Sequence, residues 1–223
     1  MNSKLSVRCS LTLALALLSV APGCLFRGSS TPPRTFEFAT AAAVRAGSAG
    51  ESALSDVEAL WRVRFDRAQA PGHLGQRMAW RQVGGEVGEL KPFRWTEAPG
   101  DVLVAELERR LGRMGFSVWR ASPSWRVGIT LEALGEYRGE GRSAEVAFEV
   151  SVEDDVGRLR FRKRYADRRP LPRNARETTD IEVLVVQLGE LAGNLLDRVA
   201  ADLTRFAESE GWSPLPAQDD STR

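Results

Sequence analysis

Two runs of alternating residues separated by a turn constrain the fold of this chain more than any other feature. From Ala144 every second residue is apolar as far as Val152, and after the sequence DDVG the alternation returns through Leu159, Phe161 and Tyr165. A period of two is typical of a strand that buries one face. The segment is therefore predicted to form an antiparallel hairpin with one apolar face.

The turn also suggests a register, and that register brings acidic and basic residues together. With Glu153 opposite Arg158, antiparallel counting places Glu149 beside Arg162. Oppositely charged side chains that face each other across neighbouring strands stabilise a sheet. The second face of the hairpin is expected to be a solvated ladder of acids and bases.

An amphipathic helix is predicted between Pro99 and Gly115. Apolar residues recur there at helical spacing, and they are Leu103, Leu107, Leu111 and Met114. Gly115 suits a C-terminal stop. Glu106 and Arg110 lie four residues apart and are expected to pair on the solvated face.

A second, longer helix is predicted near the C-terminus. Thr179 and Glu182 form a capping box at its start. Its apolar stripe comprises Ile181, Leu184, Leu188, Leu191, Leu195, Val199, Leu203 and Phe206. Gly189 and Gly193 are expected to let this helix lie close against the sheet.

The order of the predicted elements indicates a fold class. Shorter strand patterns occur at 36–38, 57–65, 77–83, 116–119 and 127–137. The chain thus runs through strands, a helix, further antiparallel strands and a long helix. We expect an α/β (α+β) fold, a two-layer sandwich in which two main helices pack on one face of a largely antiparallel sheet.

The N-terminus has the pattern of a secretory signal peptide. Lys4 and Arg8 precede an apolar run of about ten residues, well short of the roughly 20 that a membrane-spanning helix needs. The run is followed by Gly23 and Cys24, and a signal that ends in this way resembles that of a bacterial lipoprotein. The resemblance implies a diacylglycerol group on Cys24, which would become the first residue of the mature chain.

Cysteine usage agrees with a lipid anchor at Cys24. The other cysteine, Cys9, lies inside the signal, so an exported mature chain holds one thiol with no partner. The residue after Cys24 is Leu25 and not aspartate, which by the same resemblance implies the periplasmic face of the outer membrane. The alternative is ordinary cleavage near Ala21 that releases a soluble protein.

These features divide the chain into four parts. They are a lipoprotein signal peptide at 1–23, a lipidated tether at 24–35, a single α/β domain at 36–208 and a disordered tail at 209–223. The 31 Lys and Arg residues balance 30 Asp and Glu residues, so there is no global attraction to nucleic acid. The single histidine, His73, lies among turn-forming residues. We expect no enzyme activity, no cofactor and no metal site, because no catalytic or metal-binding spacing is present.

A basic run lies on the second strand of the hairpin, in the sequence RLRFRKRYADRR. One hypothesis is a patch for anionic headgroups made by Arg158, Arg160, Arg162 and Arg164. The favoured interpretation is a solvated strand face that Glu149 and Glu153 partly neutralise.

One stretch resembles a known family. The sequence FRWTEAPGDVLVAELERRLGRMGFSVW is similar to the segment of the PqiC-like, ABC-type transport auxiliary lipoproteins in which an aromatic, tryptophan, acid and proline lead into the first helix. Here Trp95, Glu97 and Pro99 carry that pattern, with one residue inserted before the proline. The order of parts agrees over about residues 36–207.

The resemblance implies a lipid-anchored auxiliary component of an ABC/MCE-type system that carries phospholipids or other hydrophobic molecules across the envelope. Such a protein binds and positions partners and does not catalyse. The implied partners are the membrane, through the N-terminal lipid, and MCE-type or other transporter components, with homo-oligomerisation left open. The alternative function is an envelope scaffold or assembly lipoprotein with no transported substrate.

The residues of the motif admit two roles. Pro99 suits the start of a helix, and Phe93 and Trp95 can fill the seam between sheet and helix. Alternatively, Phe93, Trp95, Glu97 and Pro99 form an edge that binds a partner.

Overall fold

The computed structural model describes residues 32–39, 59–118, 125–172, 177–211 and 215–216. The described residues from Pro33 onward belong to one compact unit. The predicted signal peptide and Cys24 lie outside the described residues, as do most of the predicted tether and tail. The boundaries proposed for these parts therefore stay predictions.

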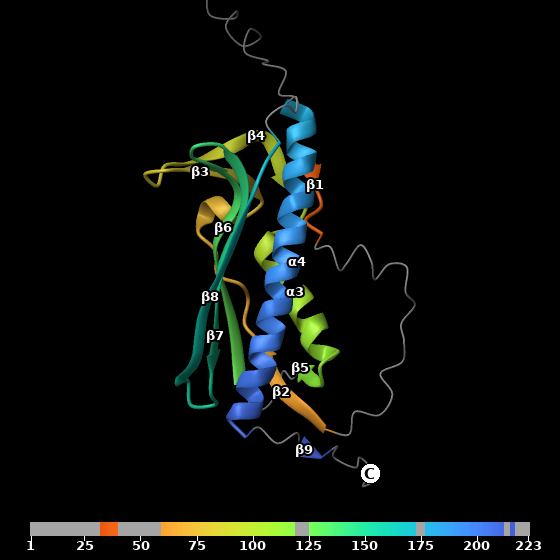
Figure 1. Cartoon of the computed structure of the whole chain (residues 1–223). Helices are drawn as coiled ribbons and strands as arrows, with labels where there is room; N and C mark the ends of the chain where they lie inside the picture. Colours follow the sequence, from red (N-terminus) through yellow and green to blue (C-terminus); the bar gives the residue numbers. More distant parts are fainter. Residues whose placement is uncertain (1–31, 40–58, 119–124, 173–176, 212–214, 217–223) are drawn as a thin grey trace, which may run out of the picture. The chain divides into compact units, whose positions relative to one another are not determined.

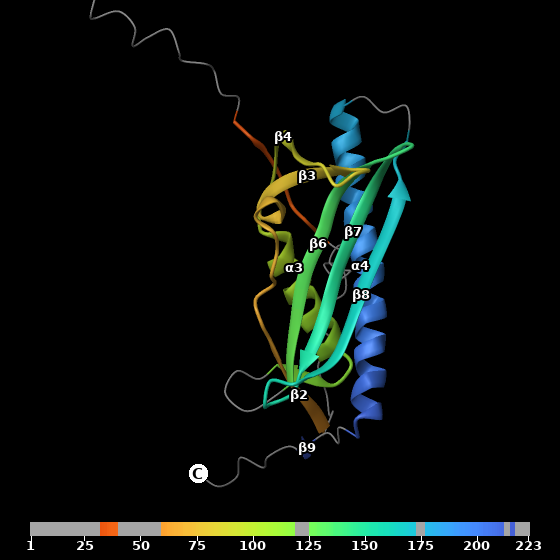
Figure 2. The same cartoon turned by 90° about the vertical axis from the view of Figure 1, so that its left-hand side faces the viewer.

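Three long strands form the main part of the sheet. They are β6 (Trp125–Arg138), β7 (Arg142–Glu153) and β8 (Leu159–Pro170). The middle strand, β7, pairs antiparallel with β6 on one side and with β8 on the other. Among the described strands, β8 pairs only with β7, so it forms one edge of the sheet (Figure 2).

Shorter strands line the other side of β6 at its two ends. Near the start of β6, the last residues of β2 (Ala59–Phe65) pair in parallel with β6. Earlier residues of β2 pair in parallel with β5 (Phe116–Val118) and antiparallel with β9 (Leu215–Pro216). Near the end of β6, β3 (Arg77–Gln82) pairs in parallel with β6 and antiparallel with β4 (Val87–Trp95). The edge strand β1 (Arg34–Phe36) pairs in parallel with β4.

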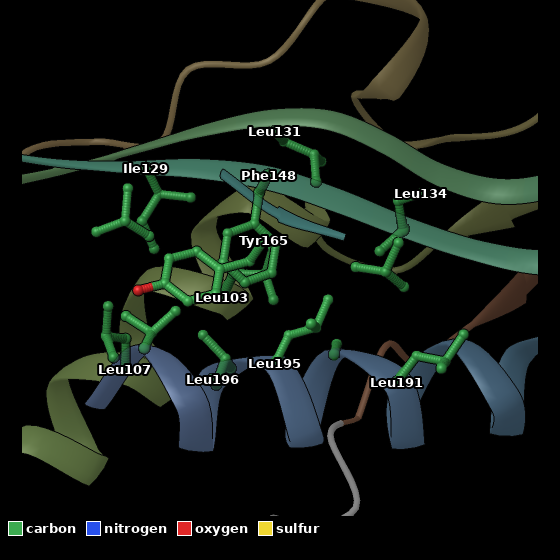
Figure 3. Close-up of a cluster of buried hydrophobic side chains, with 14 of the residues drawn as sticks. Leu103, Leu107, Ile129, Leu131, Leu134, Phe148, Tyr165, Leu191, Leu195 and Leu196 are labelled. Carbon is green, nitrogen blue, oxygen red and sulfur yellow. The ribbon is translucent and has the colours of Figure 1, made fainter. Parts of the chain in front are cut away.

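Two helices cover one face of this sheet, as Figure 1 shows. The first, α3, spans Pro99–Gly112, and the second, α4, spans Glu177–Ser209. The core lies between the helices and the sheet (Figure 3) and is built from the apolar positions that the two periodicities predict. Its fully buried side chains include Leu103 and Leu107 of α3, Ile129 and Leu131 of β6, Phe148 of β7, and Leu191, Leu195 and Leu196 of α4.

The predicted fold class is confirmed, as an α+β sandwich with two helices on one face. The short strands add parallel pairings of β1 with β4, β2 with β5, and both β2 and β3 with β6. The strand β4 was not predicted, because glycine and proline interrupt its pattern. A strand pattern reports which face is buried and not which strand is the neighbour, so these parallel pairings could not be predicted.

The hairpin of β7 and β8 forms, but in a different register from the predicted one. Glu153 lies opposite Leu159 and Glu149 opposite Arg164, with a bulge next to Glu153. The cause is the turn, where one carboxylate oxygen of Asp154 accepts hydrogen bonds from the backbone N–H groups of Val156 and Arg158. The bulge leaves Leu159 52% exposed, off the apolar face.

The end of the first helix also differs from its prediction. Leu103, Leu107 and Leu111 are fully buried, as expected. Met114 lies beyond the end of α3 and is 45% exposed, so it is not part of the core. The chain leaves the helical path there and turns at Gly115, whose φ of 88° suits glycine.

Candidate functional site

The loop between β4 and α3 is held in place on both sides. The Trp95 side chain is 3% exposed and packs edge to face on Phe38, with ring centroids 5.4 Å apart. The backbone N–H of Trp95 donates to the Gln76 carbonyl at 2.8 Å, and that of Thr96 donates to the Phe36 carbonyl at 2.9 Å. The loop is therefore fixed by its buried tryptophan and by the strands beside it.

The structure divides the four predicted partner-binding residues into two groups. Phe93 is half-buried and packs edge to face on Phe36, with centroids 5.9 Å apart. Pro99 is buried in the first turn of α3, after an extended Ala98. With Trp95 they fill the seam between sheet and helix, whereas Glu97 is exposed to solvent.

A pocket lies beside this loop, between the residues that follow β1 and one side of α3. Its volume is about 370 Å³. It is lined by Glu37, Phe38, Ala39, Thr96, Glu97, Val102, Ala105, Glu106 and Arg109. The pocket thus combines apolar side chains with three carboxylates and one guanidinium group.

The charges in this pocket do not balance. Glu106 is paired with Arg109 at 2.6 Å and with Arg110 at 2.9 Å. Burial would raise the pKa of the Glu106 carboxyl, but the hydrogen bonds from these arginines outweigh burial and lower the pKa. Glu37 and Glu97 are exposed, and the ion pairs among the described residues include neither of them. The uncompensated charge of the pocket is therefore negative.

The side of α3 next to this pocket is anchored to α4 through Arg110. The Arg110 side chain is 2% exposed and donates to the Gly193 carbonyl at 2.7 Å and to Asp197 at 2.6 Å. Pairing of Glu106 with Arg110 was predicted, but its place on a solvated face is wrong, because α4 packs over that side of α3. Gly193 was predicted to let α4 lie close against the sheet. Its carbonyl also accepts the hydrogen bond from Arg110 of α3.

The arginines of the basic run are largely paired within the chain. Arg160 binds Glu210, Arg162 binds Glu149 at 2.8 Å, and Arg164 binds Glu132 at 2.6 Å. Arg158 is exposed in the turn. The neighbouring Lys163 reaches across to Asp202 of α4 at 2.6 Å. These pairs favour the interpretation of a neutralised strand face, while headgroup binding by Arg158, Arg160, Arg162 and Arg164 stays an untested hypothesis.

Two buried carboxylates were missed in the sequence. Glu136 is 2% exposed and accepts hydrogen bonds from Arg138 at 2.9 Å and Arg142 at 2.8 Å. Glu145 is 7% exposed and binds Arg81 and Arg168. For both carboxyls burial would raise the pKa, but the arginine hydrogen bonds outweigh it and lower the pKa. Both are therefore ionised at neutral pH and suit a structural role better than that of a proton donor.

The remaining candidate features are small. His73 lies in a one-turn 3-10 helix (Gly72–Leu74), is half-buried, and borders a cavity of about 20 Å³. Within the residues that the structure describes, no three His, Cys, Asp or Glu side chains are grouped so that they could hold a metal ion. Of the described helices, none is both long and apolar enough to span a membrane.

Comparisons with known proteins identify the fold. No family model matches the chain, and no curated protein matches it. The structure is similar to protein XCC0632 from Xanthomonas campestris, of the family DUF330, with a TM-score of 0.61 and 11% identity over 80% of this chain and 99% of that one. It is also similar to an uncharacterized protein, with a TM-score of 0.52 and 10% identity over 76% of this chain and 99% of that one.

A third solved structure is less similar. This minor lipoprotein from Acinetobacter baumannii matches with a TM-score of 0.36 and 13% identity over 69% of this chain and 95% of that chain. The two higher scores show that the chain shares the fold of those two proteins.

Proposed function

We propose that this chain is a lipid-anchored, periplasm-facing auxiliary component of an ABC/MCE-type envelope transport system for phospholipids or other hydrophobic molecules. Cys24 is its anchor, in the outer membrane. The sequence pattern around Cys24 and the resemblance of the Trp95–Pro99 motif suggest this role. The observation that carries it is the position of Glu97, exposed on a fixed loop at the pocket beside α3.

The size of the pocket favours a protein partner over a lipid cargo. Pockets that enclose a drug-sized molecule measure roughly 300–1,000 Å³, and this one measures about 370 Å³. A phospholipid with two acyl chains is larger than such a molecule. The pocket therefore suits a few side chains of a partner, and in this proposal the chain positions transporter components while the lipid passes elsewhere.

The charge of the pocket defines the chemistry of that partner. Glu37 and Glu97 contribute two uncompensated carboxylates, and Phe38 and Val102 contribute apolar surface. A lysine or arginine side chain next to an apolar residue complements both features. Because charge complementarity mainly governs the choice of partner and the rate of association, a change of charge at Glu97 should affect recognition strongly.

The test exchanges one charge and leaves the core unchanged. Glu97→Lys and a matched control, Glu208→Lys, are expressed in the native host, because both glutamates are exposed. After cross-linking in membranes, we expect wild type and Glu208→Lys to recover an ATPase, a permease or an MCE-type protein. Glu97→Lys should recover at least ten-fold less while keeping the wild-type denaturation midpoint.

Two outcomes would contradict the proposal in different ways. Equal recovery of transporter components by Glu97→Lys would exclude this pocket as their binding site. Specific recovery by wild type of envelope proteins that include no transporter component would support the alternative function, a scaffold or assembly lipoprotein with no transported substrate.

A further inference from the structure

One turn at an end of the sheet presents apolar side chains to solvent. The β3–β4 turn lies against the end of β6, where the Val83 N–H donates to the Arg138 carbonyl at 3.1 Å. Val83 is 65% exposed and Val87 is 40% exposed. Between them Gly84 and Gly85 have φ values of 94° and 88°, a conformation that favours glycine and keeps the turn tight. We call residues 83–87 the Val83 tip.

The base of the Val83 tip is tightly packed. Trp80 lies against Gly88 so closely that a Cβ added there would be 2.4 Å from the indole ring. The Arg138 guanidinium lies over the same ring, 4.4 Å from its centroid. The contacts of the Trp80 ring with Gly88 and Arg138 hold the base of the tip in place.

The chain enters the fold from this end of the sheet. Strand β4 starts at the Val83 tip, and β1 runs parallel to it with Arg34 opposite Phe93. The six residues from Val87 to Phe93 span roughly 20 Å of strand. The ten residues from Cys24 to Arg34 reach at most about 35 Å when fully extended, so a bilayer holding an acylated Cys24 lies within reach of the Val83 tip.

The opposite end of the sheet also exposes an apolar side chain. Val156, in the turn between β7 and β8, is 68% exposed. The 12 residues of β7 separate the two ends by roughly 40 Å. Figure 2 shows the β3–β4 turn and the β7–β8 turn at opposite ends of the long strands. Because β1 runs parallel to β4, and β4 starts at the Val83 tip, the chain approaches β1 from the tip end of the sheet and not from the Val156 end.

We propose that the Val83 tip is a second contact with the bilayer that carries the anchor, an inference that rests on the acylation of Cys24 in the proposed function. Two exposed valines bind a bilayer only weakly by themselves. Tethering to the same bilayer makes the contact intramolecular, so weak apolar burial suffices to orient the protein. Charges of both signs surround the tip: Glu86 and Glu140 are exposed, and Arg138 and Arg142 pair with Glu136. Apolar contact and not attraction to anionic lipid therefore stabilises the contact with the bilayer.

The test compares two matched positions on the lipidated full chain. The thiol of Cys24 is consumed by acylation, so Val83→Cys and Val156→Cys each supply a single thiol for an environment-sensitive fluorophore. The proteins are purified from membranes, checked by intact mass and placed in vesicles of phosphatidylethanolamine and phosphatidylglycerol. We expect blue-shifted emission and several-fold weaker quenching by iodide at position 83, and an aqueous signal at position 156.

Each outcome has one meaning. Equal aqueous signals at both positions, on a chain whose mass includes the acyl groups, would overturn the bilayer contact and leave the proposed function intact. A membrane signal at position 156 alone would reverse the orientation and also overturn the inference. A chain without acyl mass would refute the anchor itself, and the bilayer contact with it.

Discussion

Replacement of Trp95 by alanine tests whether the motif tryptophan holds the loop or binds a partner. The indole is 3% exposed and packs on Phe38 within the core. Truncation of a buried tryptophan or phenylalanine costs about 3–5 kcal/mol in lost burial and cavity formation. The free energy of unfolding of a domain is typically about 5–15 kcal/mol, so Trp95→Ala should remove a large part of it.

The measurement is chemical denaturation at pH 7, with Glu97→Gln as the comparison. Because Glu97 is exposed, we expect its variant to stay within about 0.5 kcal/mol of wild type. A double-mutant cycle with Phe38→Leu should assign about 0.5–1.5 kcal/mol of the Trp95 effect to the edge-to-face contact. A Trp95→Ala protein within 1 kcal/mol of wild type would refute the assignment of Trp95 to the seam.

Two further predictions concern the buried carboxylate of β6 and the contact between β3 and β6. Glu136→Gln removes the carboxylate shared by Arg138 and Arg142, and we expect it to cost about 1–3 kcal/mol at pH 7. The pKa of Glu136 lies below its ordinary 4.5 in the folded protein. The contribution of its carboxylate to the free energy of unfolding is therefore complete above pH 4.5 and is lost as the pH falls through the folded-state pKa. Denaturation at several pH values should show that the difference in free energy of unfolding between wild type and Glu136→Gln shrinks below pH 4.5. Gly135→Ala would place a Cβ 2.0 Å from the Ala79 carbonyl oxygen, and we expect it to lower the free energy of unfolding by more than about 2 kcal/mol and to shift the denaturation midpoint down. Gly141→Ala, whose Cβ meets open space, should leave the midpoint unchanged. An unchanged midpoint for Gly135→Ala would contradict the pairing of β3 with β6.

The elements with a long, regular period could be predicted from the sequence, whereas the contacts between them could not. The apolar faces of β7 and α4 follow directly from periods of two and 3.6 residues. The register of β7 and β8 was missed because the Asp154 side chain sets the geometry of the turn. Pairing of Glu106 with Arg110 was predicted, but its burial depends on where α4 lies, which no local pattern states.

The candidate site was predicted only in part for the same reason. Trp95 and Glu97 stand out because of the motif, although their different exposure depends on the packing of β1 and α3. Glu37 lies in the short strand pattern predicted at 36–38, and a strand pattern does not indicate a pocket, yet Glu37 lines the same pocket. Glu136 was missed because the bulge between Leu131 and Ala133 changes the parity of β6 and turns this acid toward the helices.

The most direct test of the proposed lipid anchor is the intact mass and membrane fraction of the natively expressed protein, with wild type beside Cys24→Ser. We expect a mature wild-type chain that begins at Cys24, carries acyl mass and fractionates with the outer membrane. Cys24→Ser should lose both the acyl mass and the membrane association. An unmodified, soluble wild-type chain cut near Ala21 would contradict the proposed lipid anchor at Cys24.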